Sequence, residues 1–229
     1  MVHKNVNIPL IVKRNSPETG GCRSIVFERP MGFEFESGDW IDIAFEGEQL
    51  NGGITYSLSS SPTEPDLVIT FKDGLSEIKR KLSSLRAGDK VVIIQFGNDY
   101  KFTLKPHRAS VLIAGGVGIA PFRSMLKEMF DTSSSDQITL IYINKTSEFL
   151  FLDEINSWIR QLPHANIKLI ITKDQTKKER PKDILSAIGD LGSLFYIAGP
   201  EGMVEDTEHL LLNAGVALAD IKIDSFSGY

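Results

Sequence analysis

The feature that most constrains this chain is a glycine-rich stretch between an apolar run and an apolar helical pattern. Residues 110–125 read S-V-L-I-A-G-G-V-G-I-A-P-F-R-S-M. The run at 111–114 is typical of a strand buried on both faces of a parallel sheet. Gly116 and Gly118 allow a tight turn and a close ligand approach, and Pro121 stands where a helix should begin. Strand, turn and helix N-terminus together predict a site for an anionic group.

This turn alone leaves a structural alternative open. The full dinucleotide fingerprint G-x-G-x-x-G would have its last glycine at position 121, where this chain has proline. A Gly-Gly-x-Gly turn can also be a plain connection between a strand and a helix. The rest of the sequence must therefore decide between a ligand turn and a structural one.

From residue 110 onward, strand-like runs alternate with helix-like stretches, which predicts a parallel sheet with helices on both faces. The strand-like runs lie at 111–114, 138–143, 167–172, 194–198 and 221–224, and the helix-like stretches at 122–130, 151–161, 181–188 and 201–213. The glycine turn follows the first of these strands, where sheets of this kind bind ligands. Its position favours the ligand turn.

The preceding part of the chain carries a different pattern. Short runs rich in β-branched and aromatic residues are separated by turn clusters, which is typical of an antiparallel barrel or sandwich. The runs lie at 7–13, 22–29, 40–45, 54–58, 67–71 and 91–95, and the first turn cluster at 16–21. One helix, capped by Ser76, is expected among them. We therefore expect an N-terminal antiparallel β-barrel domain over 1–104, a linker over 105–109 and a Rossmann-like parallel-sheet nucleotide domain over 110–229.

Composition argues against several classes of protein. With 229 residues, of which 41% are hydrophobic, the chain can fill two small domains. It has no apolar run of the ~20 residues that span a membrane and no apolar signal-peptide core, so membrane insertion is not expected. The single cysteine, Cys22, argues against a disulfide or an all-cysteine metal cluster and suits a cytoplasmic location. The four histidines lack ligand spacing, so no metal site is expected.

A net charge of −5 argues against broad nucleic-acid binding, but the charge is unevenly distributed. Residues 72–108 hold nine basic residues against four acidic ones. The basic residues are Lys72, Lys79, Arg80, Lys81, Arg86, Lys90, Lys101, Lys105 and Arg108. This segment is either an ordinary solvated face or a landing patch for an acidic partner or an anionic cofactor.

Three further stretches carry candidate chemistry. Tyr56 and Ser57 could flank and hydrogen-bond a planar ring, although they also fit a plain strand that runs into a serine-rich turn. Residues 197–203, I-A-G-P-E-G-M, repeat the order of strand, turn and helix at the same sheet edge as the first glycine turn. The chain ends at 221–229 with an aromatic residue after glycine, which could stack on a ring, although terminal residues are often frayed.

In this order and at this spacing, the motifs resemble the ferredoxin–NADP⁺ reductase superfamily of flavin- and nicotinamide-dependent reductases. Y-S-x-S-S at 56–60 is similar to its flavin motif R-x-Y-S-x-A-S, and G-G-V-G-I-A-P at 115–121 to its pyridine-nucleotide motif. A-G-P-x-x-M at 198–203 is similar to its C-G-P-x-x-M, and D-x-F-x-G-Y at 224–229 to its acidic ending. The resemblance covers nearly the whole chain.

The resemblance implies a role for each motif. Tyr56 would pack on the isoalloxazine, and Ser57 would hydrogen-bond near flavin N5, the atom that accepts hydride. Asp224 and Tyr229 would join Ser57 in the catalytic group, and Phe226 or Tyr229 would cover the other flavin face. The remaining implied cofactor-binding residues are Leu58 and Ser59 beside the flavin, Gly74, Leu75, Ser76 and Lys79 at its phosphates, and Gly116, Gly118, Ile119, Pro121, Lys145, Gly199, Pro200 and Met203 at the nicotinamide cofactor.

Three positions depart from the family pattern. Ile54 stands where the family has the arginine that holds the flavin phosphate, and an apolar side chain cannot supply that charge. We expect Lys79 or Arg80 to take over. Ala198 replaces a cysteine beside the nicotinamide, which predicts slower hydride transfer rather than none. Asp224 stands where glutamate is commoner.

The sequence therefore predicts a flavoprotein oxidoreductase that passes hydride from NADH or NADPH to bound FAD, with FMN as the alternative. With one cysteine there is no built-in iron–sulfur domain, so electrons would leave to a separate acceptor such as ferredoxin, flavodoxin or an oxygenase component. An acidic electron-carrier protein could dock at 72–108. Two alternatives stay open, namely a reductase that uses flavin as a diffusible substrate and a non-catalytic, degenerate subunit. NADH and NADPH also stay open. Residues 144–147 offer no carboxylate for ribose hydroxyls and Lys145 could hold a 2′-phosphate, but N-x-T at 144–146 is similar to NADH-using relatives.

Overall fold

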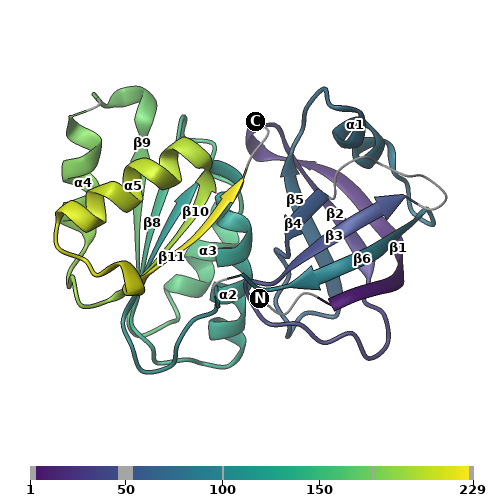
Figure 1. Ribbon diagram of the computed structural model, residues 1–229, viewed down its shortest axis with the longest axis horizontal. Coiled ribbons are helices and arrows are strands. Elements are labelled where there is room, and N and C mark those ends of the chain that lie inside the picture. Colours follow the sequence, from purple (N-terminus) through teal and green to yellow (C-terminus); the bar gives the residue numbers. More distant parts are fainter. Residues whose placement is uncertain (1–3, 46–53, 100, 177, 227–229) are drawn as a thin grey trace.

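The computed structural model describes residues 4–45, 54–99, 101–176 and 178–226. Figure 1 shows two units side by side, a barrel-like antiparallel sheet and a parallel sheet flanked by helices. The fold class expected from the sequence is confirmed. Among the described residues, no helix combines the length and the apolar character needed to cross a membrane.

The first unit is a six-stranded antiparallel sheet in the order β4–β3–β6–β1–β2–β5. Its elements are β1 (Lys4–Glu18), β2 (Cys22–Glu28), β3 (Trp40–Phe45), β4 (Ile54–Ser57), β5 (Asp66–Lys72), α1 (Glu77–Ser84) and β6 (Lys90–Gly97). An isolated bridge between Leu58, just after β4, and Ile69 of β5 joins the two edges and closes the sheet into a barrel. The alternate residues of each strand point inward, and Leu10, Ile25 and Ile69 are fully buried there.

The turn expected at 16–21 is shorter than predicted. β1 continues through Pro17 to Glu18, and the chain reverses in the single 3₁₀ turn η1 (Thr19–Gly21), whose two glycines have φ of +66° and +67°. Among the described residues, β1 pairs with β6 as far as Ile11 and with β2 beyond it. Pro17 therefore lies where β1 has an open side, and its missing N–H disturbs no ladder there.

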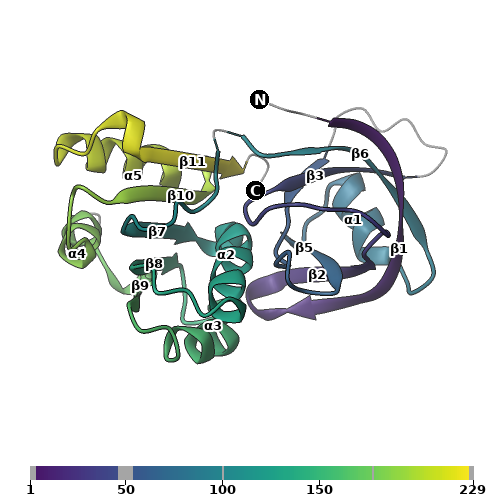
Figure 2. The same cartoon turned by 90° about the horizontal axis from the view of Figure 1, so that it is seen from below.

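The second unit is a five-stranded parallel sheet in the order β11–β10–β7–β8–β9. Its elements are β7 (Ser110–Gly115), η2 (Gly116–Gly118), α2 (Ile119–Asp131), β8 (Ile138–Asn144), α3 (Leu152–Ile159), β9 (Ala165–Ile171), η3 (Thr172–Asp174), α4 (Glu179–Ala187), β10 (Leu194–Pro200), α5 (Glu201–Asn213), η4 (Leu218–Asp220) and β11 (Ile221–Phe226). Separate apolar clusters place α2 and α3 on one face of the sheet and α4 and α5 on the other (Figure 2). Each strand-like run and helix-like stretch of the sequence corresponds to one of these elements.

The apolar core beneath α2 extends into the barrel unit. Phe102, after β6, stacks on Phe122 of α2 with ring centroids 5.7 Å apart and meets the edge of Tyr196 at 5.5 Å. The barrel loop that contains Gly38 also lies close to α2, because a Cβ added at Gly38 would be 2.9 Å from Cε of Met125. Apolar packing thus holds the barrel against α2, and the carboxyl end of β11 points at the barrel (Figure 2).

Candidate functional site

The first glycine turn lies at the barrel-facing edge of the parallel sheet. β7 ends at Gly115, the chain turns through η2, and α2 begins at Ile119. Gly116 has φ +55°, and a Cβ added there would meet no atom within 4 Å. Pro121 lies in the first turn of α2, where a backbone N–H has no intrahelical acceptor. The turn therefore presents an open surface beside a helix N-terminus, which is the arrangement that a phosphate group needs.

The second glycine of the motif serves close packing instead. A Cβ at Gly118 would overlap the carbonyl group of Ala198, with its carbon at 2.5 Å, and would lie 2.7 Å from Cα of Gly199. A Cβ at Gly115 would be 2.5 Å from Cε of Met203. The structure therefore brings the two glycine turns, which the sequence placed at one sheet edge, into direct contact. Gly199 itself has φ +153°.

A buried tyrosine holds the first turn in place. Tyr142 of β8 is fully buried, and its hydroxyl donates to the carbonyl of Gly116 at 3.1 Å while accepting from the N–H of Leu150 at 3.1 Å. Its ring meets Phe149 edge-on at 4.9 Å. Burial raises the pKa of Tyr142, so the hydroxyl stays protonated and keeps donating. Tyr142 is not among the site residues expected from the sequence, where its signal is a single tyrosine in a mostly apolar strand.

On the barrel side, Ser57 ends β4 and reaches the other domain. Its hydroxyl donates to Oδ2 of Asp224 at 2.8 Å. Asp224 lies in β11 and pairs in register with Ala198 of β10. Tyr56, one residue before Ser57, packs against Phe71 with ring centroids 5.8 Å apart. Residues of three separate sequence motifs therefore meet at one point between the domains.

The carboxyl group at this point has an unusual acidity. The pKa of Asp224 is raised to about 6, mainly by burial; the hydrogen bond from Ser57 acts to lower it, and the negative charge of Asp99 acts to raise it. A carboxyl group with a pKa near 6 can hold or release a proton close to neutral pH. Perturbed groups of this kind concentrate at functional sites.

The turn before α1 carries positive charge. Ser76 caps the helix, as expected, and its Oγ accepts from the N–H of Lys79 at 3.3 Å. The Lys79 side chain lies over Gly74, since a Cβ there would be 2.8 Å from Cδ and 3.6 Å from Nζ. Leu75 between them is 88% exposed. An ammonium group over an exposed turn at a helix N-terminus suits a phosphate. The side chain of Ile54 lies outside the described residues.

The other expected site residues differ in whether their side chains could reach a cofactor. Leu58, Ser59 and Ile119 are fully buried, so any contact that they make with a cofactor would use the backbone. Phe226 pairs in register with Pro200, beside the second glycine turn. Tyr229 lies outside the described residues, so its expected role is not placed here.

Lys145 follows β8 at the outer part of this sheet edge. It is exposed, and its carbonyl accepts from the N–H of Lys173, which follows β9. The side-chain amide of Asn144 donates to the carbonyls of Thr146 at 3.3 Å and Glu148 at 2.9 Å. Asn144 therefore closes the loop after β8, in which Lys145 is exposed.

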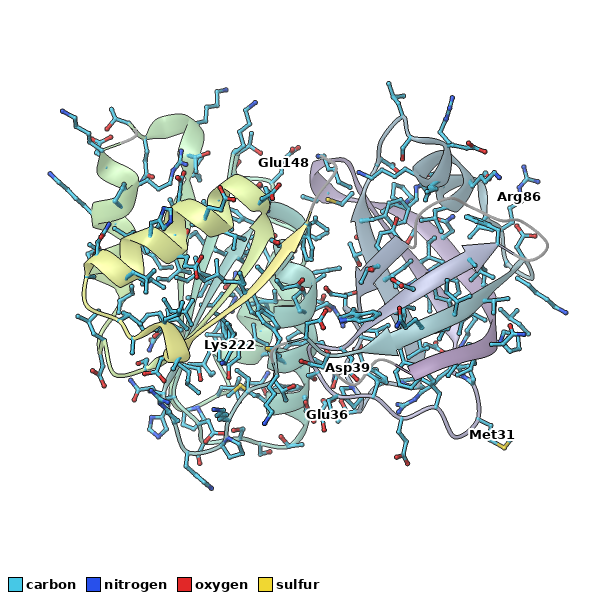
Figure 3. All side chains as sticks on the ribbon, in the orientation of Figure 1. Met31, Glu36, Asp39, Arg86, Glu148 and Lys222 are labelled. Carbon is cyan, nitrogen blue, oxygen red and sulfur yellow. The ribbon has the colours of Figure 1, made fainter. Side chains whose placement is uncertain are left out.

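The basic residues of 72–108 do not form one patch. Lys72 donates to the carbonyl of Gly20, and Arg108 pairs with Asp220 at 2.8 Å in the other domain. Arg80 is exposed on α1, and Arg86 is exposed just after that helix (Figure 3). The positive face that could meet a partner is therefore smaller than expected and centres on α1.

Comparisons with known proteins agree with this geometry. Residues 112–209 match the family described as "Oxidoreductase NAD-binding domain". The chain is 30% identical over 224 residues to oxidoreductase NAD-binding domain-containing protein 1 of Pongo abelii, covering 83% of this chain and 69% of that protein. It is 28% identical to the Bos taurus protein of that name over 76% of this chain, and 28% identical to dual oxidase 2 of Sus scrofa over 72% of this chain. It spans 65% and 12% of the length of those two relatives.

Solved structures show the same two-unit fold. The FAD/NAD-binding domain of nitric oxide dioxygenase from Vibrio cholerae has a TM-score of 0.78 at 22% identity, covering 97% of this chain and 99% of that one. Ferredoxin–NADP⁺ reductase from Plasmodium falciparum has a TM-score of 0.78 at 16% identity, covering 96% of each chain. At these identities the likeness establishes the fold.

Proposed function

This chain belongs to the family of oxidoreductase NAD-binding domain proteins and has the fold of ferredoxin–NADP⁺ reductase, and from that premise we propose that it is a flavoprotein that oxidises NADH or NADPH and passes the electrons through bound FAD. The observation that carries the proposal is the meeting of Ser57, Asp224 and Ala198 beside two packed glycine turns. Each of these features comes from a different motif, and a site between the domains would use them together.

The residues fit both cofactors. The open, positive-φ position at Gly116, in front of α2, suits the pyrophosphate of a nicotinamide dinucleotide. Lys79 over the turn at Gly74 suits the flavin phosphates and compensates for the apolar residue at Ile54. Bound FAD would supply the hydride-accepting ring, and the protein would align the two rings and exclude water. We also propose the segment 105–109 as the boundary between a flavin domain and a nucleotide domain.

The chain's own proton chemistry would centre on one pair. Ser57 donates to Asp224, so the hydroxyl and the carboxyl group form a short path along which a proton can move toward the flavin side. Because the pKa of Asp224 lies at about 6, this carboxyl is close to half-protonated at slightly acidic pH and mostly ionised at pH 8. Turnover should therefore change between pH 5 and pH 8 through this pair.

The decisive experiment is an anaerobic titration. Purified protein is desalted, its bound flavin is identified by chromatography, and NADH or NADPH is added while the visible flavin bands are recorded. Bleaching by either nicotinamide supports the proposal. Persistent bands in flavin-loaded protein would refute it and favour a non-catalytic subunit. Colourless protein that reduces added flavin would instead identify flavin as a diffusible substrate.

The electron acceptor is proposed to be a separate acidic carrier protein that docks near α1. The exposed Arg80 and Arg86 support this location, and opposite charges speed the encounter of such partners. A cytoplasmic location belongs to the same proposal and rests on a single thiol, Cys22, which is buried and whose pKa burial raises.

A further inference from the structure

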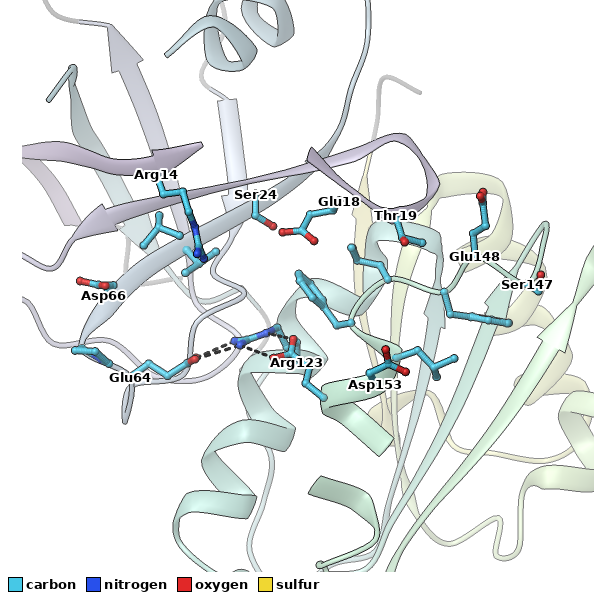
Figure 4. Close-up of a pocket in the computed structure, with 18 residues that line it drawn as sticks. Arg14, Glu18, Thr19, Ser24, Glu64, Asp66, Arg123, Ser147, Glu148 and Asp153 are labelled. Carbon is cyan, nitrogen blue, oxygen red and sulfur yellow. Dashed lines mark hydrogen bonds and ion pairs between the residues drawn. The ribbon is translucent and has the colours of Figure 1, made fainter. Parts of the chain in front are cut away.

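Arg123 of α2 makes polar contacts with both domains (Figure 4). Its side chain is 12% exposed. Nε and Nη2 donate to the carboxylate of Glu154 at 2.7 and 3.0 Å, and Nη1 and Nη2 donate to that of Glu64 at 2.8 and 3.1 Å. Nη1 also donates to the carbonyl of Ser59 at 2.7 Å. These contacts use all of the N–H donors that a guanidinium group has.

The acceptors belong to different parts of the fold. Glu154 lies on α3 of the same domain, whereas Ser59 and Glu64 belong to the barrel loop that follows the Tyr56–Ser57 motif. Two bidentate carboxylate pairs fix the angle as well as the distance of the guanidinium plane. The group also lies over the ring of Trp158 at 5.3 Å.

The charge of Arg123 is secure in this setting. Burial acts to lower the pKa of the guanidinium, but hydrogen bonds to Glu64 and Glu154 more than offset it, so the pKa is raised. Glu64 is held in turn by the N–H of Ser61 at 2.7 Å. The loop after β4 is thus tied to α2 by an ionised group whose partners are themselves fixed.

Arg123 is not alone on this side of the interface, because the hydroxyl of Thr63 in the same loop donates to the carboxylate of Asp131 on α2. A cavity of about 690 Å³ lies beside Arg123, between the outer face of the barrel and the loop after β8 (Figure 4). Glu18 and Ser24 from the barrel and Asp153 from the nucleotide domain are among its lining residues. Because this side of the interface is hollow, polar contacts rather than close packing bridge it.

Arg123 lies between the two halves of the proposed site. It comes four residues after Ile119, the first residue of the helix that carries the glycine turn. Its acceptor Ser59 comes two residues after Ser57. The next residue, Ser124, donates its hydroxyl to the carbonyl of Ser60 at 2.7 Å and repeats the connection.

We propose that Arg123 is a positioning residue, which sets the separation between the nicotinamide-binding turn and the Ser57 strand through Glu64 and the Ser59 carbonyl. The proposal rests on the proposed function, because it assigns the arginine to hydride transfer between two rings. Misplacement of reacting groups by about 1 Å can slow a reaction by about a hundredfold. Loss of the bridge should therefore slow flavin reduction more than it weakens nicotinamide binding.

The two glutamates provide a matched pair of variants. Glu64→Gln and Glu154→Gln each leave Arg123 facing one carboxylate, so the buried charge changes equally, but only Glu64→Gln weakens the link between domains. Flavin-loaded variants are mixed anaerobically with NADH or NADPH in a stopped-flow instrument. We expect Glu64→Gln to slow flavin reduction by about tenfold or more with a KM within about twofold of wild type, and Glu154→Gln to stay within about twofold in both. Equal rates in the two variants would overturn the proposal.

A second measurement does not depend on catalysis. Hydrogen exchange is recorded on flavin-free protein for peptides that span 56–62 and 116–124. Glu64→Gln should accelerate exchange in both peptides, and Glu154→Gln in neither. Matching exchange in the two variants would overturn the positioning role even if the wild type proved inactive. If the wild type fails to bleach while the exchange difference holds, the proposed function fails and the bridge between domains stands.

A conservative variant covers the case in which Glu64→Gln does not fold. Arg123→Lys keeps the charge but offers a point donor that cannot hold two carboxylates and a carbonyl together. It should fold, bind flavin and show an intermediate reduction rate. A wild-type reduction rate in Arg123→Lys would also overturn the proposal.

Discussion

Separate substitutions of Gly116 and Gly118 should distinguish the two roles of the first turn, which are phosphate binding and close packing against the second turn. In Gly118→Ala the new Cβ would lie 2.5 Å from the carbonyl carbon of Ala198 and 2.7 Å from Cα of Gly199. Non-bonded carbons pack at about 3.5 Å or more, so the two turns would have to separate by roughly 1 Å. In Gly116→Ala the Cβ meets no atom within 4 Å, and the penalty comes from the φ of +55° alone.

The expected magnitudes differ accordingly. Overpacking of this kind costs about 3 kcal/mol, which lowers the Tm of a chain of this size by roughly 6–12 °C. A left-handed alanine costs about 1 kcal/mol, which lowers the Tm by roughly 2–4 °C. For nicotinamide affinity the order should be reversed, with the larger loss in Gly116→Ala. The Cβ at position 116 would occupy the space where a phosphate approaches, so Kd should rise at least about tenfold, equivalent to 1.4 kcal/mol.

Thermal unfolding of flavin-free protein and calorimetric titration with NADH and NADPH measure the two effects independently. Gly118→Ala should lose mainly stability, and Gly116→Ala mainly affinity. A Gly116→Ala variant that binds nicotinamide as tightly as the wild type would refute the phosphate role of this turn. A Gly118→Ala variant that melts within about 2 °C of the wild type would refute the close packing of the two turns.

Four other predictions address the rest of the site. Lys79→Glu should weaken flavin binding at least about tenfold in an equilibrium fluorescence titration, whereas Lys81→Glu, whose lysine pairs with Glu77, should not. The folded-state pKa of Asp224 is raised from 3.8 to about 6, so stability linked to the neutral acid is present at low pH and lost as pH rises through about 6. The full effect of this pKa shift on stability is about 3 kcal/mol, of which roughly half is already lost at pH 5, so Asp224→Asn should raise Tm more at pH 8 than at pH 5. Tyr142→Phe should raise the nicotinamide KM and cost about 1–3 kcal/mol, while Tyr196→Phe, which loses one bond to a carbonyl before β7, should leave KM unchanged. Reduction of an acidic carrier should slow steeply with added salt, and a flat salt dependence would exclude that class of acceptor.

Local patterns in the sequence were enough to predict the two units of the fold. Buried strands, turn clusters and the helix capped by Ser76 each depend on residues close in the sequence. The full length of β1 was not predicted, because Pro17 is typical of a turn. In the structure β1 has no β6 partner at Pro17, so the missing N–H of this proline breaks no hydrogen bond between strands. Whether a strand can contain a proline depends on which strands pair with it, and this pairing cannot be read from the residues near the proline.

The site was predictable only in part for the same reason. Its glycine turns follow a sequence pattern, and the pairing of Ser57 with Asp224, separated by 167 positions, was reachable only through the family resemblance. Tyr142 and Arg123 escaped notice, because a tyrosine in an apolar strand and an arginine on a helix are ordinary residues until their acceptors are known. The carbonyl that Arg123 holds is 64 positions away in the chain.

The stacking of Phe102 on Phe122 makes each unit part of the other's interior. A fragment with only the parallel sheet would expose Phe122 and Met125, and a fragment with only the barrel would expose Phe102. Exposure of one such side chain costs about 1.5–3 kcal/mol, a large part of the roughly 5–15 kcal/mol that stabilises a domain. A chimera that joins this barrel to a foreign nucleotide domain would therefore need the rings on both sides of the contact to be exchanged together.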